Sequence, residues 1–490
     1  MGTLHLDKIM TFDPYKLIKY HIYLLQLESY ELGRFWKLLF KRGWFGANLE
    51  QRKSLVWTKK AVLLFIISEL LILLLAGFLS YKGFYAPFSF WWQRVFTFLV
   101  VVYILDFFTP LFLSVSTLLL WPFDFFAKQM IMGSAKSKIK SLPNLKVIGI
   151  AGSYGKTTMK EVLKEVLGFR FKVLATPESV NTPVGISRWI LKSISPDQEI
   201  LIVEMGEHYR GDVKELCAIT KPDFAVVTGI NEAHLERMKT LENVTATIFE
   251  IVSKAKAGAT VMLNGDDANV MAHYKEYVWP DHKVLEYRVE DVKNKVLNSE
   301  ELLWEGELEG VGKVEINLLG EYALADVDAA VKIAQALGMS PKEIRQGISR
   351  IKPVEHRLQA IKSPGNVLVI DDSYNGNPDG VTEAIKVLAS FTGRRKLFIT
   401  PGLVEMGKAA PDVHRKIGKE LAGVASVVIL IKNSVTLYIE EGIKSGSQQS
   451  AVSNQIVWFD TTQEAHAALG KILQPNDVIL FQNDWGDNYL

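Results

Sequence analysis

Residues 147–158 read VIGIAGSYGKTT, an apolar strand that runs into a glycine-rich loop and then Gly-Lys-Thr. Backbone N–H groups of such a loop face phosphate oxygens, and the helix predicted at residues 156–168 adds the positive end of its dipole. Lys156 supplies a full positive charge, and the Thr157 hydroxyl is placed for Mg2+. The strict pattern requires glycine at position 150, where this chain has Ile150, so a glycine-rich turn with a chance lysine is the structural alternative. The stretch predicts a site for a nucleoside triphosphate.

Length and composition narrow the class of protein. The 490 residues suffice for about three domains. The 56 basic and 54 acidic residues nearly cancel, so the charge balance indicates no nucleic-acid partner. Cys217 is the single cysteine, which excludes an internal disulfide, fits a reducing compartment and argues against a structural zinc site.

Apolar residues are concentrated near the N-terminus, in two segments long enough to span a membrane. Residues 61–79 are about as long as ~30 Å of hydrocarbon requires, and residues 95–121 are longer and interrupted by Pro110. Roughly sixty residues precede the first segment, which argues against a cleaved signal. Lysine and arginine are denser outside the pair than between its members, which predicts that both ends lie in the cytoplasm. We therefore expect a multi-pass protein of the inner membrane whose phosphate loop meets cytoplasmic ATP.

Each predicted span carries one acidic residue, Glu69 in the first and Asp106 in the second. A charge at mid-bilayer costs on the order of 3 kcal/mol, so these acids either bind a headgroup, a proton or a partner subunit, or are protonated and hydrogen-bonded across the hairpin. The aromatic, aliphatic and basic residues within residues 1–60 recur at helical spacing. They predict helices on the inner leaflet, with a core-packed helix pair as the alternative.

Beyond a basic connector, apolar runs alternate with helical stretches, which is typical of an α/β fold with a parallel sheet covered on both faces. The first such unit has predicted strands at residues 146–150, 171–175, 199–204, 224–228 and 260–263. Short antiparallel strands are expected within residues 283–319, followed by a helix at 323–337. The second unit has predicted strands at residues 367–370, 396–400, 426–431, 456–459 and 478–481.

The expected domain organisation follows from these patterns. It comprises interfacial helices at 1–60, a transmembrane hairpin at 61–121, a basic connector at 122–142, an ATP-binding domain at 143–352 and a C-terminal domain at 353–490.

Polar side chains follow several predicted strands. Glu204 ends the strand in LIVEMGEHYRGD, and Asn231 and His234 follow the next strand in TGINEAHLERM. The carboxyl ends of parallel strands share one sheet edge, where ligands bind, so Glu204 is placed to bind Mg2+ beside the phosphates. The plainer alternatives are a solvated turn residue for Glu204 and a surface histidine for His234.

Three later motifs carry amides, acids and an aromatic ring at turns. They are LNGDDANV with Asn264, HRLQ with Arg357, and VIDDSYNGNP with Asp371, Tyr374 and Asn375. Such groups can bind a base and ribose, or can merely form tight turns.

In this order, AGSYGKTT, SVNTPVGIS, VEMGEHYRGD, NEAHLERM, LNGDD, HRLQ and IDDSYNGNP resemble the motifs of the Mur ligase family of ATP-dependent amide-bond formers, over about residues 143–490. The resemblance implies a P-loop central ATPase domain followed by a Rossmann-like C-terminal domain. It also implies that a substrate carboxylate attacks the γ-phosphate of ATP, and that an amine then displaces phosphate from the acyl phosphate. Within the family it favours D-alanyl-D-alanine addition to a UDP-N-acetylmuramoyl-tripeptide in peptidoglycan biosynthesis.

The resemblance also implies roles for matching residues. Lys156, Glu204 and His234 would be catalytic, and Thr157, Glu204 and His234 would bind metal. Asn181 and Thr182 match a loop that faces the carboxylate substrate. The implied ATP-binding residues are Ala151, Gly152, Ser153, Tyr154, Gly155, Lys156, Thr157, Thr158, Asn264, Arg357, Asp371, Tyr374 and Asn375.

The chain departs from the family pattern in three places. Ile248 stands where many members have a carbamylated lysine that bridges a second metal, and Glu250, Lys254 or Lys256 would have to compensate. The hairpin takes the place of the domain that grips the UDP-sugar, and the chain finishes in FQNDWGDNYL instead of a basic end.

These departures keep alternative functions open. The expected partners are a cell-wall precursor carboxylate, an amino-acid or dipeptide amine, the lipid bilayer and membrane-embedded wall-synthesis proteins. One alternative is an amino-acid ligase acting on a lipid-linked or polyglutamate-type acceptor. Another is a degenerate ATP-binding membrane scaffold, and a transport ATPase is a weaker one.

Overall fold

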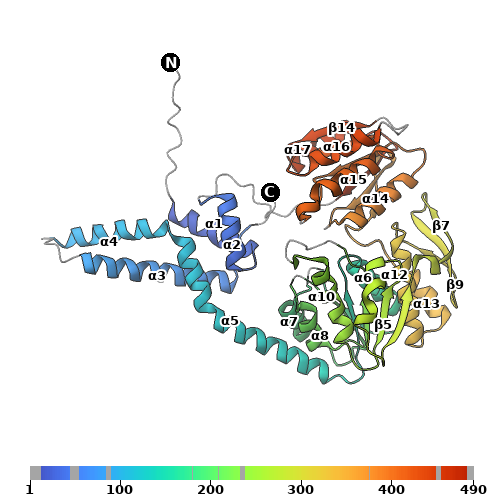
Figure 1. The fold of residues 1–490 in the computed structure, drawn as a ribbon, viewed down its shortest axis with the longest axis horizontal. Coiled ribbons are helices and arrows are strands. Elements are labelled where there is room, and N and C mark those ends of the chain that lie inside the picture. The colour runs from blue at the N-terminus through green and yellow to red at the C-terminus, as the bar shows by residue number, and fades with distance from the viewer. Residues whose placement is uncertain are drawn as a thin grey trace, which may run out of the picture. The chain divides into compact units, whose positions relative to one another are not determined.

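The structure is a computed structural model, drawn as a ribbon in Figure 1, and it is described at residues 13–44, 54–83, 90–178, 180–207, 209–231, 238–374, 376–404, 406–447 and 454–482. The chain divides into two compact units, Met1–Gln129 with Gly486–Leu490, and Met130–Trp485. The first is helical, and the second holds two α/β domains.

The first unit opens with two helices that pack on longer ones. The helices described in it are α1 (Pro14–Leu27), α2 (Leu32–Arg42), α3 (Lys59–Gly83), α4 (Trp91–Asp106) and the start of α5 (Thr109–Lys140). Leu24 of α1 and Phe35 of α2 are buried in one cluster with Leu64 of α3 and Leu113 of α5. The buried faces of α1 and α2 thus correspond to the packed helix pair, and contact with the inner leaflet stays a prediction for their exposed faces.

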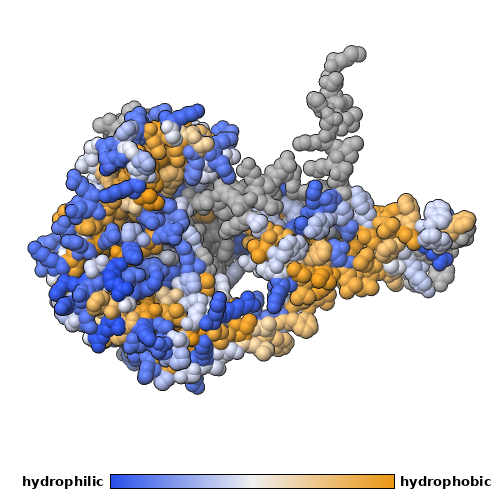
Figure 2. Space-filling model, turned by 180° about the vertical axis from the view of Figure 1, so that it is seen from behind, coloured by the Kyte–Doolittle hydropathy of each residue, from blue (hydrophilic) through white to orange (hydrophobic). Residues whose placement is uncertain are grey.

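Helices α3, α4 and α5 leave many large apolar side chains exposed, and Figure 2 shows hydrophobic residues gathered along these helices. By length and composition, Lys59–Tyr81 and Thr109–Lys140 could each cross a membrane. The predicted span at residues 95–121, interrupted by Pro110, is divided between two helices, because α4 ends at Asp106 and a new helix begins at Thr109. Pro110 has no N–H to donate to the carbonyl of residue 106, which favours a break of the helix there.

The first α/β domain is built on a six-stranded parallel sheet in the order β2-β3-β1-β4-β5-β6. Its strands are β1 (Lys146–Ala151), β2 (Val173–Ala175), β3 (Ile200–Glu204), β4 (Phe224–Val227), β5 (Thr260–Asn264) and β6 (Lys283–Tyr287). The five strands predicted within residues 146–263 are confirmed. The prediction that residues 283–287 are antiparallel is wrong, since β6 pairs parallel to β5. The intervening α11 (Ala268–His273) carries the chain back to the start of the sheet.

Helices cover both faces of this sheet. One face packs on α6 (Lys156–Leu167), α12 (Tyr322–Ala336) and α13 (Pro341–Ile348). The other packs on α7 (Pro183–Ser193), α8 (Asp212–Thr220) and α10 (Leu241–Ser253). A small antiparallel sheet of β7 (Lys293–Asn298), β8 (Leu303–Leu308) and β9 (Gly312–Ile316) precedes α12.

The second α/β domain has a six-stranded sheet in the order β10-β11-β15-β12-β13-β14. Its strands are β10 (Gln359–Ser363), β11 (Val367–Asp372), β12 (Lys396–Thr400), β13 (Val427–Ile431), β14 (Gln455–Phe459) and β15 (Val478–Gln482). Its helices are α14 (Pro378–Ser390), α15 (Ala410–Ala422), α16 (Thr436–Ser447) and α17 (Thr462–Ile472). All of its pairs are parallel except β10 with β11, and β10 is the one strand of this sheet that the hydrophobic pattern does not predict.

Candidate active site

The glycine-rich loop lies at the carboxyl edge of the first sheet, between β1 and α6. Gly152 has φ 153°, and a Cβ there would lie 2.1 Å from Thr228 Oγ1. Gly155 caps α6 in the left-handed region, with φ 76°. The Ser153 N–H donates to the Gly229 carbonyl at 2.8 Å, which ties the loop to the end of β4. The loop conformation therefore requires glycine at both positions.

Four charged side chains meet behind this loop. Lys156 Nζ donates to Glu207 Oε1 at 2.7 Å and also to the Gly152 carbonyl. Lys160, one turn further along α6, places its Nζ 3.0 Å from Glu204 Oε2. The Thr157 hydroxyl lies 3.2 Å from the other oxygen of Glu204. The charges pair off as Lys156 with Glu207 and Lys160 with Glu204.

The structure thus brings together three residues that the sequence predicts, Lys156, Thr157 and Glu204. It adds Lys160 and Glu207, whose side chains are each 1% exposed. Signals for both were present, because Lys160 follows Lys156 by four residues on one helix and Glu207 lies within the VEMGEHYRGD motif. His234, the third predicted catalytic residue, lies outside the described residues.

These residues fit a triphosphate with Mg2+. The first N–H groups of α6 have no intrahelical acceptor and point toward the loop, and Lys156 adds positive charge. The Thr157 hydroxyl and the Glu204 carboxylate are oxygen ligands of the kind that Mg2+ prefers. Within the described part of the chain, no group of three or more His, Cys, Asp or Glu side chains is arranged to hold a metal by itself. Bound Mg2+ would neutralise phosphate charge here, with the phosphates completing its ligand set.

Tyr154 and Asn264 brace the loop from the β4 and β5 side. The Tyr154 hydroxyl donates to Asp267 Oδ2 at 2.6 Å, and burial, together with the Asp267 charge, raises the pKa of this phenol. Asn264 Nδ2 donates to the Thr228 carbonyl at 2.7 Å. Tyr154 and Asn264 both lie at the carboxyl edge of the sheet, where their polar groups bond to the protein itself.

The predicted residues of the C-terminal domain form one cluster. Arg357 Nη1 donates to the Tyr374 carbonyl at 2.6 Å, and the guanidinium lies 4.8 Å from the centre of the Tyr374 ring. Asp371 accepts a hydrogen bond from His356 Nδ1 at 2.7 Å. Asn375 lies outside the described residues.

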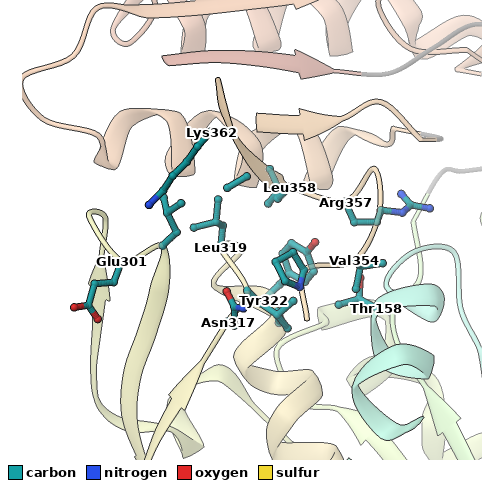
Figure 3. A pocket seen from close by; sticks show the side chains of 15 residues that line it. Thr158, Glu301, Asn317, Leu319, Tyr322, Val354, Arg357, Leu358 and Lys362 are labelled. Carbon is teal, nitrogen blue, oxygen red and sulfur yellow. The ribbon is translucent and has the colours of Figure 1, made fainter. Parts of the chain in front are cut away.

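A hydrogen bond and a cavity lie between the C-terminal domain and the first α/β domain. Asn231, after β4, donates through Nδ2 to Asp379 Oδ2 at 2.9 Å, in the first turn of α14. A cavity of about 170 Å3 between the two domains is lined by Thr158, Tyr322 and Arg357 among others, and Figure 3 labels these three among the side chains around it. The first turn of α6, at Thr158, and the start of the C-terminal domain, at Arg357, therefore border a common space.

Asn181 and Thr182 lie beside the segment that follows Glu204. The Gly206 N–H donates to the Asn181 carbonyl at 2.9 Å, and a Cβ at Gly206 would lie 2.9 Å from Asn181 Cγ. The Thr182 hydroxyl caps α7 by accepting the Gly185 N–H at 3.3 Å. Thr182 is thus a helix cap, while Asn181 is held against the strand end that carries Glu204.

Two of the three suggested replacements for the missing lysine, Glu250 and Lys256, are bonded elsewhere. Ile248 is fully buried in α10. Glu250 Oε2 accepts the Lys214 N–H at 2.8 Å. Lys256 pairs with Asp223 at 2.8 Å, before β4 and hence at the sheet edge opposite Glu204. Lys256 therefore cannot complete a metal site at Glu204.

Comparison with known proteins places this geometry in a family. Residues 150–334 match the Mur ligase middle domain, and residues 356–482 match the glutamate ligase domain of Mur ligases. The chain belongs to the Mur ligase family. It is accordingly an ATP-dependent amino-acid ligase, and the expectation of two α/β domains with a parallel sheet in the first is confirmed.

Individual Mur ligases match most of the chain. It is 26% identical over 361 residues to the UDP-N-acetylmuramoyl-tripeptide–D-alanyl-D-alanine ligase of Bacillus subtilis, covering 72% of this chain and 76% of that one. The Synechocystis enzyme of the same name is 28% identical over 340 residues, 69% of this chain and 71% of its own length. A MurF ligase from Thermotoga maritima, solved in complex with ADP, has the same fold, with a TM-score of 0.64, 24% identity, and coverage of 73% of this chain and 80% of that one.

Proposed function

We propose that this Mur ligase adds D-alanyl-D-alanine to a UDP-N-acetylmuramoyl-tripeptide while anchored to the membrane. The observation that carries the proposal is the cluster of Lys156, Thr157 and Glu204 behind the glycine loop, in a chain whose relatives are named for this reaction. Lys156 and the loop amides would hold the β and γ phosphates of ATP, and Thr157 and Glu204 would share one Mg2+. His234 is proposed to assist at a second metal.

The remaining predicted residues would recognise the nucleotide and the acceptor. Arg357, Asp371, Tyr374 and Asn375 would reach the base, ribose and phosphates when the C-terminal domain closes. The cavity beside Thr158 and Tyr322 gives a base room next to the first turn of α6. Asn181, beside the strand end of Glu204, would face the acceptor carboxylate. Closure would exclude the water that otherwise hydrolyses an acyl phosphate.

The membrane anchor rests on the exposed apolar side chains of α3 to α5 and on the length of two of these helices. The lysines of the connector would face anionic headgroups on the cytoplasmic side. The α/β domains would then work in the cytoplasm.

The test is an assay of phosphate release by the full-length protein in detergent or vesicles. Release should require ATP, the tripeptide acceptor and the dipeptide amine together, and a Lys156→Ala variant should lose it. Release in the absence of acceptor or of amine would contradict the proposal. Activity with glutamate or another single amino acid in place of the dipeptide would favour a polyglutamate-type ligase.

A second acceptor deserves a parallel assay because of the apolar helices. A ligase tethered to a bilayer meets lipid-linked precursors at high local concentration. Adding the muramoyl peptide either as its UDP form or as a lipid-linked form in vesicles would decide between them, since the proposal expects turnover with the UDP form.

A further inference from the structure

The lysine of the phosphate loop already has an anionic partner inside the protein. Lys156 Nζ lies 2.7 Å from Glu207 Oε1, and the side chain of Glu207 is 1% exposed while that of Lys156 is 13% exposed. Such a short, largely buried contact between an ammonium and a carboxylate is a strong, charge-assisted hydrogen bond. The Lys156 ammonium is therefore already paired with a carboxylate before any phosphate binds.

Among the residues that the structure describes, Lys156 is the one cation paired with Glu207. Its Oε2 is buried and has no hydrogen-bond partner among the residues that the structure describes. The neighbouring buried cation, Lys160, is paired with Glu204. If Lys156 moved to a phosphate, Glu207 would remain as a buried carboxylate beside new negative charge, which is unfavourable.

We propose that Glu207 is an internal competitor for Lys156, a positioning residue that lowers the affinity of the loop for phosphate ligands. The inference rests on the proposed function only in that the glycine loop must bind a nucleotide. A ligand has to displace the Glu207 carboxylate from Lys156 before the ammonium can reach its phosphates. The apparent affinity is then the intrinsic affinity multiplied by the fraction of molecules in which Lys156 is free.

The competing explanation is that Glu207 holds Lys156 in the position that phosphate binding needs. The two explanations predict opposite changes in nucleotide affinity for one substitution. Replacing Glu207 by glutamine keeps its size but removes its charge. Competition predicts tighter nucleotide binding in this variant, whereas support predicts weaker binding.

The experiment is isothermal calorimetry of ADP and of ATP with Mg2+ on the full-length protein and on Glu207→Gln. We expect the dissociation constants to fall about tenfold, as they would if Lys156 were paired in about nine of ten molecules. The control is Glu165→Gln, which also removes one negative charge. Glu165 lies on α6 outside the loop, with its carboxylate 3.9 Å from Arg350 Nε. The dissociation constants of this variant should equal those of the unmodified protein.

A second variant and a second readout separate the outcomes. Glu207→Asp keeps the charge but shortens the side chain, so it should also tighten binding, by less than glutamine does. The rise in melting temperature with ADP reports folding and binding together, and it should be larger in Glu207→Gln than in the unmodified protein. Unchanged or weaker binding in Glu207→Gln would overturn the inference. Absence of nucleotide binding in the unmodified protein would instead overturn the proposed function.

Discussion

At the scale of single residues, the candidate site depends on buried charges that neutralise one another. Lys160 lies 3.0 Å from Glu204 Oε2, with 1% of its side chain exposed. We expect Lys160→Met to destabilise the protein by about 3 kcal/mol, because it leaves Glu204 buried without its cation. Lys164→Met is the matched control, since Lys164 is 46% exposed and pairs with Glu161 at the surface. It should cost less than about 0.5 kcal/mol. Chemical denaturation of the three proteins measures both values, and equal losses would contradict this assignment.

Asp372 should make stability depend on pH. Burial raises the pKa of this carboxyl to about 7, against smaller opposite effects from Arg357 and from the Leu358 N–H. Between its ordinary pKa and about pH 7 the folded protein keeps a proton that the unfolded chain loses, so stability falls as pH rises. Asp372→Asn, which is always neutral and still accepts the Leu358 N–H, removes that penalty.

The variant should be more stable than the unmodified protein by on the order of 3 kcal/mol at pH 8, and by progressively less toward pH 5. Melting temperatures of the two proteins across this range provide the measurement. A difference that stays constant with pH would show that Asp372 is charged in the fold throughout.

At the scale of elements, the connection from β1 to α6 is the most constrained. A Cβ at Gly152 would lie 2.1 Å from Thr228 Oγ1 and 2.9 Å from the Gly229 nitrogen, at φ 153°. Gly152→Ala should therefore shift the loop, lower the melting temperature and weaken ADP binding at least tenfold. Gly470→Ala, in α17 with nothing within 4 Å of the added methyl group, should leave ADP binding unchanged and be neutral or slightly stabilising. Normal nucleotide affinity in Gly152→Ala would rule out the role given to this loop.

The sequence predicts elements well where apolar runs are bounded by turn residues, as in β1, β3 and β12. It fails where pairing depends on the tertiary path, because the direction of β6 is set by the return through α11 and the edge strand β10 has a polar sequence. The interruption expected at Pro110 within residues 95–121 lies where α4 ends and α5 begins, because this residue has no N–H for the helical hydrogen bond. At the site, the motif AGSYGKTT predicts Lys156 and Thr157, and the motif VEMGEHYRGD predicts Glu204. The pairings of Lys160 and Glu207 could not be predicted, because they depend on side-chain positions across two elements.

At the scale of the whole molecule, we propose that the protein is a ligase carried by a membrane anchor. We predict that the full-length chain stays with the membrane fraction after an alkaline carbonate wash and is released only by detergent, because exposed apolar side chains on α3 to α5 have no cover in water. Release into the supernatant by carbonate alone would contradict a spanning anchor. A soluble cytoplasmic enzyme carried through the same preparation controls for trapping in vesicles.

The central claim is that the loop before α6 presents the terminal phosphoryl group of ATP to a carboxylate. The most direct test uses an acceptor in which both oxygens of the terminal carboxylate are 18O. This acceptor is incubated with ATP, Mg2+, the amine and the full-length protein. Attack by the carboxylate on the γ-phosphorus, followed by amine displacement, must leave one 18O atom in each phosphate released. The account predicts that transfer, together with its loss in Lys156→Ala. Phosphate that carries no 18O while amide forms would contradict it.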